Sequence, residues 1–76
     1  MSCRVRNRIR ELRFATGEMT QQELADRVGV TRQTVNAIEG EKYSPTLEMA
    51  FEIAGVFGIP LEHVFTYEGH RKRRGS

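Results

Sequence analysis

Apolar residues recur at intervals of three and four along most of the chain, which is the spacing of one buried helix face. The longest such run follows Pro45 and comprises Leu47, Ala50, Ile53, Ala54 and Phe57. Alternation typical of a strand is confined to residues 4–9. The pattern therefore predicts an all-α fold without an internal repeat.

Residues that cap or break helices divide this pattern into helical segments. The first is predicted to begin at Asn7, a good N-cap, and to stop at Gly17 as its C-terminal cap. Thr20-Gln21-Gln22-Glu23 has the form of a capping box, so a second helix begins at Gln21. Pro45-Thr46 opens the fourth helix, and residues 61–65 are long enough for one or two turns of a fifth.

Between the second and fourth helices, the turn Gly29-Val30-Thr31 separates two short helices. Gly29 can adopt the positive φ of a helix end, and Thr31 can cap a third helix over residues 32–39. Ala25 allows the two helices to approach closely, and Val35 would anchor the third helix to the core. These features predict a helix-turn-helix motif over about residues 20–39.

The segment TQQELADRVGVTRQTVNAIEGEKYSPTLEMAFEIAGVFGIPLEHVF resembles the lambda-repressor-like helix-turn-helix family, also called XRE, which includes Cro and phage repressors. The resemblance covers residues 7–65 and rests on T-Q-x-E-L-A, the turn at Gly29 and E-G-x-K-x-x-P-T-L, in that order. The join from Gly17 to Thr20 has one residue more than is usual in the family. The resemblance implies a compact five-helix domain over residues 7–67, whose third helix reads bases.

By the same resemblance, the residues matching base-contacting positions are Arg32, Gln33, Asn36, Thr34 and Ala37. Arginine can bind guanine, glutamine or asparagine can bind adenine, and an alanine methyl can touch a thymine methyl. The residues matching positions beside the DNA backbone are Thr20, Gln21, Thr31, Lys42 and Tyr43. The alternatives are an ordinary solvated helix face, a polar helix start at Gln21, a solvated Lys42 and a packing Tyr43.

Two further residues match positions that form an ion pair in some relatives. Arg13 would connect the first helix to Glu39 at the end of the third. If the pair is partly buried, it would mainly fix the position of the first helix relative to the third, because desolvation offsets much of its Coulomb energy. The alternative is two separate surface charges.

Charge is distributed unevenly along the chain. Residues 1–46 carry eight basic and six acidic side chains, whereas residues 47–69 carry four glutamates and no lysine or arginine. A basic N-terminal arm over residues 1–6, extended by Arg8 and Arg10, could follow the DNA backbone or remain solvated. Residues 68–76 are predicted to be a disordered basic tail, with Arg71–Arg74 as a backbone contact, a localisation signal or a solubilising end.

Length and composition exclude several classes of protein. Seventy-six residues make a single domain, and no apolar run approaches the length of a membrane span or follows the basic start as a signal peptide would. The lone Cys3, with His63 and His70 apart from it, offers neither a catalytic set nor a zinc site. We therefore expect a cytoplasmic protein that is not an enzyme and needs no cofactor or metal.

These observations predict a small transcriptional regulator that binds double-stranded DNA sequence-specifically, and we expect it to be a repressor. We expect a homodimer on a pseudo-palindromic operator, because one short helix makes too few contacts for useful selectivity. Surplus apolar residues between Val56 and Tyr67 could form its two-fold interface. The alternative is a protein-interaction module, such as an antitoxin that binds a toxin, using Phe14, Glu48 and Glu52.

Overall fold

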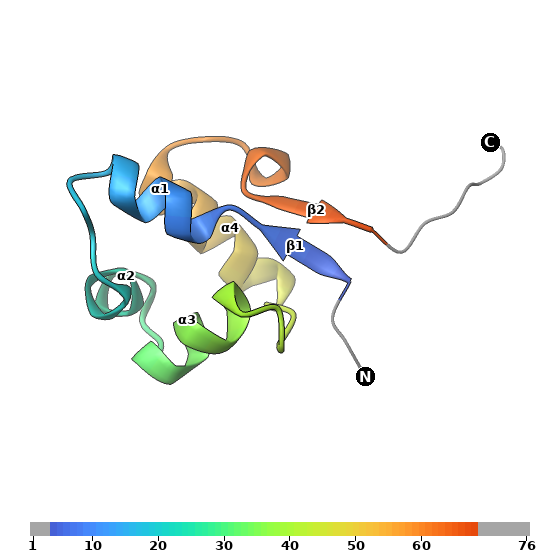
Figure 1. The fold of residues 1–76 in the computed structure, drawn as a ribbon, viewed down its shortest axis with the longest axis horizontal. Coiled ribbons are helices and arrows are strands. Elements are labelled where there is room, and N and C mark those ends of the chain that lie inside the picture. Colours follow the sequence, from blue (N-terminus) through green and yellow to red (C-terminus); the bar gives the residue numbers. More distant parts are fainter. Residues whose placement is uncertain (1–3, 69–76) are drawn as a thin grey trace, which may run out of the picture.

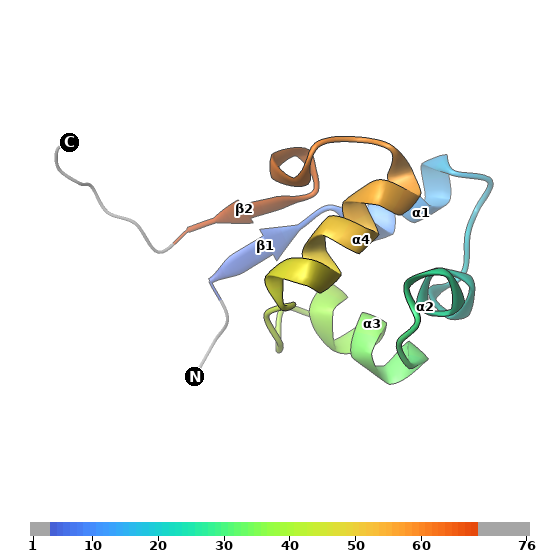
Figure 2. The same cartoon turned by 180° about the vertical axis from the view of Figure 1, so that it is seen from behind.

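The computed structural model describes residues 4–68, which form four α-helices, one short 3-10 helix and a two-stranded sheet (Figure 1). In chain order the elements are β1 (Val5–Asn7), α1 (Ile9–Ala15), α2 (Gln21–Val28), α3 (Arg32–Glu39), α4 (Leu47–Phe57), η1 (Leu61–His63) and β2 (Phe65–Tyr67). Seen from behind, α4 lies between the sheet on one side and the α2–α3 pair on the other (Figure 2). No helix within residues 4–68 combines the length and apolarity needed to cross a bilayer.

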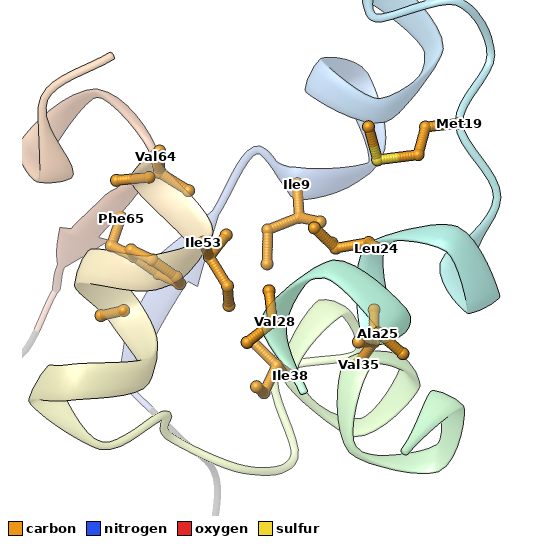
Figure 3. Close-up of a cluster of buried hydrophobic side chains, with 12 residues drawn as sticks. Ile9, Met19, Leu24, Ala25, Val28, Val35, Ile38, Ile53, Val64 and Phe65 are labelled. Carbon is orange, nitrogen blue, oxygen red and sulfur yellow. The ribbon is translucent and has the colours of Figure 1, made fainter. Parts of the chain in front are cut away.

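One hydrophobic core joins all of the helices (Figure 3). Its largest fully buried side chains are Ile9, Leu24, Val35, Ile38, Ile53 and Val64. Each buried aliphatic side chain of this size contributes about 1.5–3 kcal/mol of hydrophobic stabilisation. Met19 is also buried, although it lies in the loop between α1 and α2, where helical spacing gives no signal.

Helices α2 and α3 begin and end at the predicted residues because local chemistry fixes their ends. The Thr20 hydroxyl accepts from the Glu23 backbone N–H at 3.0 Å, and the Glu23 carboxylate accepts from the Thr20 N–H at 2.8 Å. Gly29 ends α2 in the left-handed conformation with φ of +87°. Thr31 then caps α3 by accepting from the Thr34 N–H at 3.2 Å.

The prediction of five α-helices is wrong at the C-terminal end. The fifth helix is reduced to the single 3-10 turn η1, and Phe65 belongs to β2 instead. After the turn the backbone is drawn toward the start of α1, where the Val64 carbonyl accepts from the Arg8 N–H at 2.9 Å. A long-range contact thus replaces the next helical turn.

The predicted start of the first helix is also displaced. Asn7 pairs with Phe65 in the sheet, and Arg8 is the N-cap residue of α1. The Asn7 side chain still accepts from the Ile9 N–H at 3.1 Å, and it donates to the Ile38 carbonyl at 2.8 Å. Helix α1 ends at Ala15 with Thr16 as its C-cap residue, and Gly17 follows in the left-handed conformation, as predicted for a glycine that caps a helix end.

The extra residue in the loop after α1 is accommodated by two consecutive residues in the left-handed conformation. Gly17 has φ of +68° and Glu18 has φ of +56°. The Met19 N–H then donates to the Arg13 carbonyl at 2.9 Å, which returns the chain to the core before α2 begins. Positive φ at a non-glycine residue such as Glu18 is uncommon and reflects how tightly this loop turns.

The antiparallel sheet joins segments from opposite ends of the chain (Figure 1). Val5 pairs with Tyr67, Arg6 with Thr66 and Asn7 with Phe65. Val5 and Arg6, which were expected to belong to an N-terminal arm, therefore lie in β1. Apart from Glu68, the predicted basic tail lies outside the described residues.

Candidate nucleic-acid interface

The two sides of α3 differ sharply in exposure. Val35 and Ile38 are only 1% and 2% exposed and anchor the helix in the core. Arg32, Gln33 and Asn36 are exposed on the opposite side. Of the other residues expected to contact bases, Thr34 and Ala37 are half-buried. The helix therefore presents a polar edge that no later segment of the described chain covers.

The first residue of α2 is connected to this edge by side-chain hydrogen bonds. Gln21 is half-buried, and its Nε2 donates to Asn36 Oδ1 at 3.2 Å and to Glu39 Oε1 at 3.3 Å. Sequence reasoning placed Gln21 beside the DNA backbone but did not anticipate these bonds. They depend on how α2 crosses α3, which helical spacing within either element does not define.

Arg13 and Glu39 are in direct contact at the other end of this network. Arg13 Nε donates to Glu39 Oε2 at 2.6 Å, and Arg13 Nη2 donates to Glu39 Oε1 at 3.1 Å. The two side chains are only 8% and 9% exposed. The third guanidinium nitrogen, Arg13 Nη1, donates to the Met19 carbonyl at 2.8 Å. The guanidinium thus holds together α1, the end of α3 and the loop before α2.

The other residues matched to backbone-contacting positions are arranged around the motif. Thr20 and Thr31 are exposed, but their hydroxyls serve as helix caps, and the Thr31 hydroxyl also lies 3.0 Å from that of Thr34. Lys42 and Tyr43 are exposed in the loop after α3. The Lys42 N–H donates to the Ala37 carbonyl at 2.9 Å, which keeps this loop close to the end of α3.

Two arginines of the expected basic arm, Arg6 and Arg8, form ion pairs within the domain. Arg6 contacts Glu41 at 2.6 Å and Glu68 at 2.9 Å, and its hydrogen bonds to Glu68 and Glu41 raise the pKa of its guanidinium above the ordinary value. Arg8 pairs with Glu11 at 3.1 Å and donates to the His63 carbonyl. These contacts neutralise part of the positive charge that the sequence suggested for DNA.

Two hollows lie on the surface, in different chemical settings. One, of about 390 Å³, borders the hydrogen-bond network and is lined by Arg10, Arg13, Phe14, Gln21, Asn36, Glu39 and Gly40. The other, of about 680 Å³, is a shallow apolar depression on α4 beside Leu47, Glu48, Phe51 and Glu52. Within residues 4–68, no three His, Cys, Asp or Glu side chains are grouped closely enough to hold a metal ion.

Two short capped helices joined by a left-handed glycine, the second with one buried and one exposed polar side, define a helix-turn-helix protein. The model of the helix-turn-helix family HTH_3 matches residues 9–64. The chain belongs to this family of lambda-repressor-like, or XRE, helix-turn-helix proteins. The family is one of DNA-binding regulators, in agreement with the expectation that the chain is not an enzyme.

Similar proteins occur in archaea and bacteria. The chain is 45% identical over 64 residues to an uncharacterized HTH-type transcriptional regulator of Methanocaldococcus jannaschii, covering 84% of this chain and 96% of that protein. It is 44% identical over 64 residues to the uncharacterized HTH-type transcriptional regulator YgzD of Bacillus subtilis, with the same coverage.

A crystal structure of a proposed DNA-binding protein from Bacteroides fragilis has a similar fold. It superimposes with a TM-score of 0.70 at 22% identity, covering 82% of this chain and 98% of that one. At this identity the likeness concerns the fold alone.

Proposed function

We propose that this protein is a sequence-specific regulator of transcription that places α3 in the major groove of double-stranded DNA. The observation that carries the proposal is the division of α3 into a buried side, with Val35 and Ile38, and an exposed side, with Arg32, Gln33 and Asn36. A helix anchored in this way can hold polar side chains rigidly against base edges. Relatives named as HTH-type transcriptional regulators support the same function.

In this proposal the side chains of the motif have different tasks. Arg32 and Gln33, on the first turn of α3, contact bases through their multiple hydrogen-bonding groups, and Ala37 and Thr34 contribute smaller contacts. Two segments lie along the DNA phosphates. One is the start of α2, with Thr20 and Gln21, and the other is the loop with Lys42 and Tyr43. The start of α3, at Thr31, also approaches the DNA backbone.

The experiment compares binding of a selected duplex and of random DNA by Arg32→Ala, Gln33→Ala and a control, Arg27→Ala. Arg27 is exposed in the last turn of α2, so the control removes the same charge away from the reading edge. Loss of a good base contact costs about 1–3 kcal/mol, so the preference for the selected duplex should fall about 5- to 150-fold for the two α3 variants. Equal losses on both DNAs would contradict base reading.

A phosphate contact should respond differently from a base contact. Lys42→Ala is expected to weaken binding to all sequences alike and to reduce the slope of log affinity against log salt by about one. Affinities measured at several salt concentrations test this assignment. A change in the selected sequence, with an unchanged salt slope, would argue against it.

We further propose that the protein acts as a homodimeric repressor on a pseudo-palindromic operator. Two copies of α3 about one helical turn apart would read two half-sites and occlude the promoter. Of the C-terminal apolar residues, Val64 and Phe65 are used by the core of one copy, whereas Tyr67 is exposed and Ile59 and Leu61 are half-buried. Sedimentation at micromolar concentration should detect a dimer, and a monomer both with and without DNA would refute this part.

A second candidate function is binding of a protein such as a toxin through α4. Leu47 and Phe51 are 66% and 57% exposed there, beside Glu48 and Glu52. Apolar groups next to carboxylates favour a partner that presents apolar and basic side chains together. Co-expression with the product of a neighbouring gene should yield a complex that Phe51→Ser disrupts, and a complex unaffected by this substitution would exclude α4 as its surface.

A further inference from the structure

We infer that Arg6 promotes DNA binding without contacting DNA, by neutralising the Glu41 carboxylate in the loop that follows α3. This inference rests on the proposed function, because it concerns how that loop meets the DNA phosphates. Two observations about Glu41 carry it. One is the conformation of its backbone, and the other is the partner of its side chain.

The backbone of Glu41 adopts a conformation that favours glycine. The Lys42 N–H donates to the Ala37 carbonyl at 2.9 Å, and the Glu41 N–H donates to the Ile38 carbonyl at 3.0 Å. These two bonds form a Schellman motif at the end of α3, in which the residue at the position of Glu41 is left-handed and usually glycine. Glu41 has φ of +61°. A glutamate is therefore kept here at a cost in backbone energy, which a function of its carboxylate would explain.

The Glu41 carboxylate is paired with a cation from the other end of the chain. Arg6 Nη1 contacts Glu41 Oε1 at 2.6 Å, and the two side chains are 50% and 28% exposed. The Asn7 side chain also donates to the Ile38 carbonyl at 2.8 Å, so two consecutive residues of β1 hold the end of α3. In Figure 1, β1 lies between β2 and the loop that follows α3. Strand β1 thus brings a guanidinium to this loop.

The position of the carboxylate in the loop makes its neutralisation important. Glu41 directly precedes Lys42 and Tyr43, which are exposed and lie along phosphates in the proposed function. An unpaired carboxylate beside them would repel the phosphates that Lys42 attracts. Two like charges about 4 Å apart in water repel by an energy equivalent to about fivefold in affinity. Pairing with Arg6 removes this repulsion.

The same contacts argue against a direct bond from Arg6 to DNA. Arg6 Nη1 is bound to Glu41, and Arg6 Nη2 lies 2.9 Å from Glu68 Oε1. A phosphate would have to displace one of these carboxylates, and the displaced carboxylate would then repel it. Arg6 therefore acts on DNA through Glu41, and Lys42 and Tyr43 make the contacts.

The test measures the affinity of the full chain for the selected duplex and for random DNA, by fluorescence anisotropy at about 0.1 M salt. Arg6→Gln removes the positive charge but keeps side-chain N–H groups that can still donate to Glu41. We expect this variant to bind both DNAs about fivefold more weakly, because the carboxylate then repels phosphates of any sequence.

Three double variants make the result specific. Arg6→Gln/Glu41→Gln and Arg6→Gln/Glu41→Gly also remove the carboxylate, so their affinities should lie within about twofold of the unmodified protein, although no ion pair is restored. This recovery would also show that the Arg6 substitution leaves the chain folded. Arg6→Gln/Glu68→Gln is the matched control, because it has the same net charge as the other two but retains Glu41. It should stay at least about threefold weaker than the unmodified protein.

An Arg6→Gln variant that binds DNA as tightly as the unmodified protein would overturn the inference. Equal recovery by the Glu41 and Glu68 double variants would also overturn it, because the effect would then be one of net charge alone. Recovery by none of them would do the same, because Arg6 would then contact phosphate directly or serve only the fold. Each of these results leaves the proposed function intact. An unmodified protein that shows no sequence preference at all would instead refute the proposed function.

Discussion

The Arg13–Glu39 pair allows a quantitative test, because both side chains are more than nine-tenths buried. We expect Glu39→Leu to lower the free energy of unfolding by about 3–5 kcal/mol, since it leaves the Arg13 guanidinium buried without its counter-charge. The total stability of a domain this small is only about 3–10 kcal/mol. The single variant should therefore lose a large part of its stability.

Replacing both partners by apolar residues should lower the free energy of unfolding by much less than the sum of the two single losses. Arg13→Met alone leaves a buried carboxylate, but in the double variant Arg13→Met/Glu39→Leu no charge remains unpaired. The double variant still loses the bond from Arg13 to the Met19 carbonyl, which costs about 1–3 kcal/mol. We therefore expect its stability to lie within about 3 kcal/mol of the unmodified protein.

Urea unfolding followed by far-UV circular dichroism measures all four members of this cycle. The exposed pair Arg8–Glu11, with side chains 54% and 71% exposed, is the matched control. Its corresponding variants should change stability by less than about 1 kcal/mol. The reasoning is refuted if Glu39→Leu costs as little as the control, or if the double variant loses the sum of the two single losses.

Four other substitutions test the backbone and the core by the same urea assay. Gly29→Ala should lower the free energy of unfolding by about 1–2 kcal/mol, because the φ of Gly29 is +87°. Gly55 lies inside α4 with open space around it, so Gly55→Ala should raise the free energy of unfolding by about 0.5–1 kcal/mol. Equal effects of the two substitutions would contradict the role of φ. Thr20→Ala should cost about 1 kcal/mol through loss of the capping box with Glu23, and no change would mean that α2 does not need this cap. Ile53→Ala should cost about 2–5 kcal/mol as a core cavity forms, and a loss below 1 kcal/mol would indicate that the site is not packed.

The parts of the fold that depend on neighbouring residues could be predicted from the sequence. The ends of α2 and α3 follow from Thr20, Gly29 and Thr31, each of which acts on backbone groups within three or four positions. The exposed edge of α3 follows from helical spacing once Val35 and Ile38 are assigned to the core. These features need no knowledge of the rest of the chain.

The features that sequence reasoning missed depend on distant partners. Asn7 has the chemistry of an N-cap, but pairing with Phe65 draws its backbone into a strand. Arg6 has the charge of a DNA-binding arm, yet it meets Glu41 and Glu68 through folding of the chain. A strand of three residues carries too short a pattern to be distinguished from a helix start.

The candidate site also combines features that are set by neighbouring residues with features that depend on distant ones. Which residues of α3 face outward is a local property, and the sequence identified Arg32, Gln33 and Asn36 as exposed. The bonds from Gln21 to Asn36 and Glu39 arise where two helices cross, so they could be found only from their relative placement. The identity of the candidate readers was thus predictable, but the orientation of the Asn36 amide was not.

The sheet has a consequence for how the molecule is made. Its two strands are separated by nearly the whole domain, so β1 remains without its partner until the ribosome has synthesised Tyr67. Closing a loop of this length is entropically costly, and such pairings form late in folding. Because Val64 and Phe65 also belong to the core, the core too is completed only after this end of the chain has emerged.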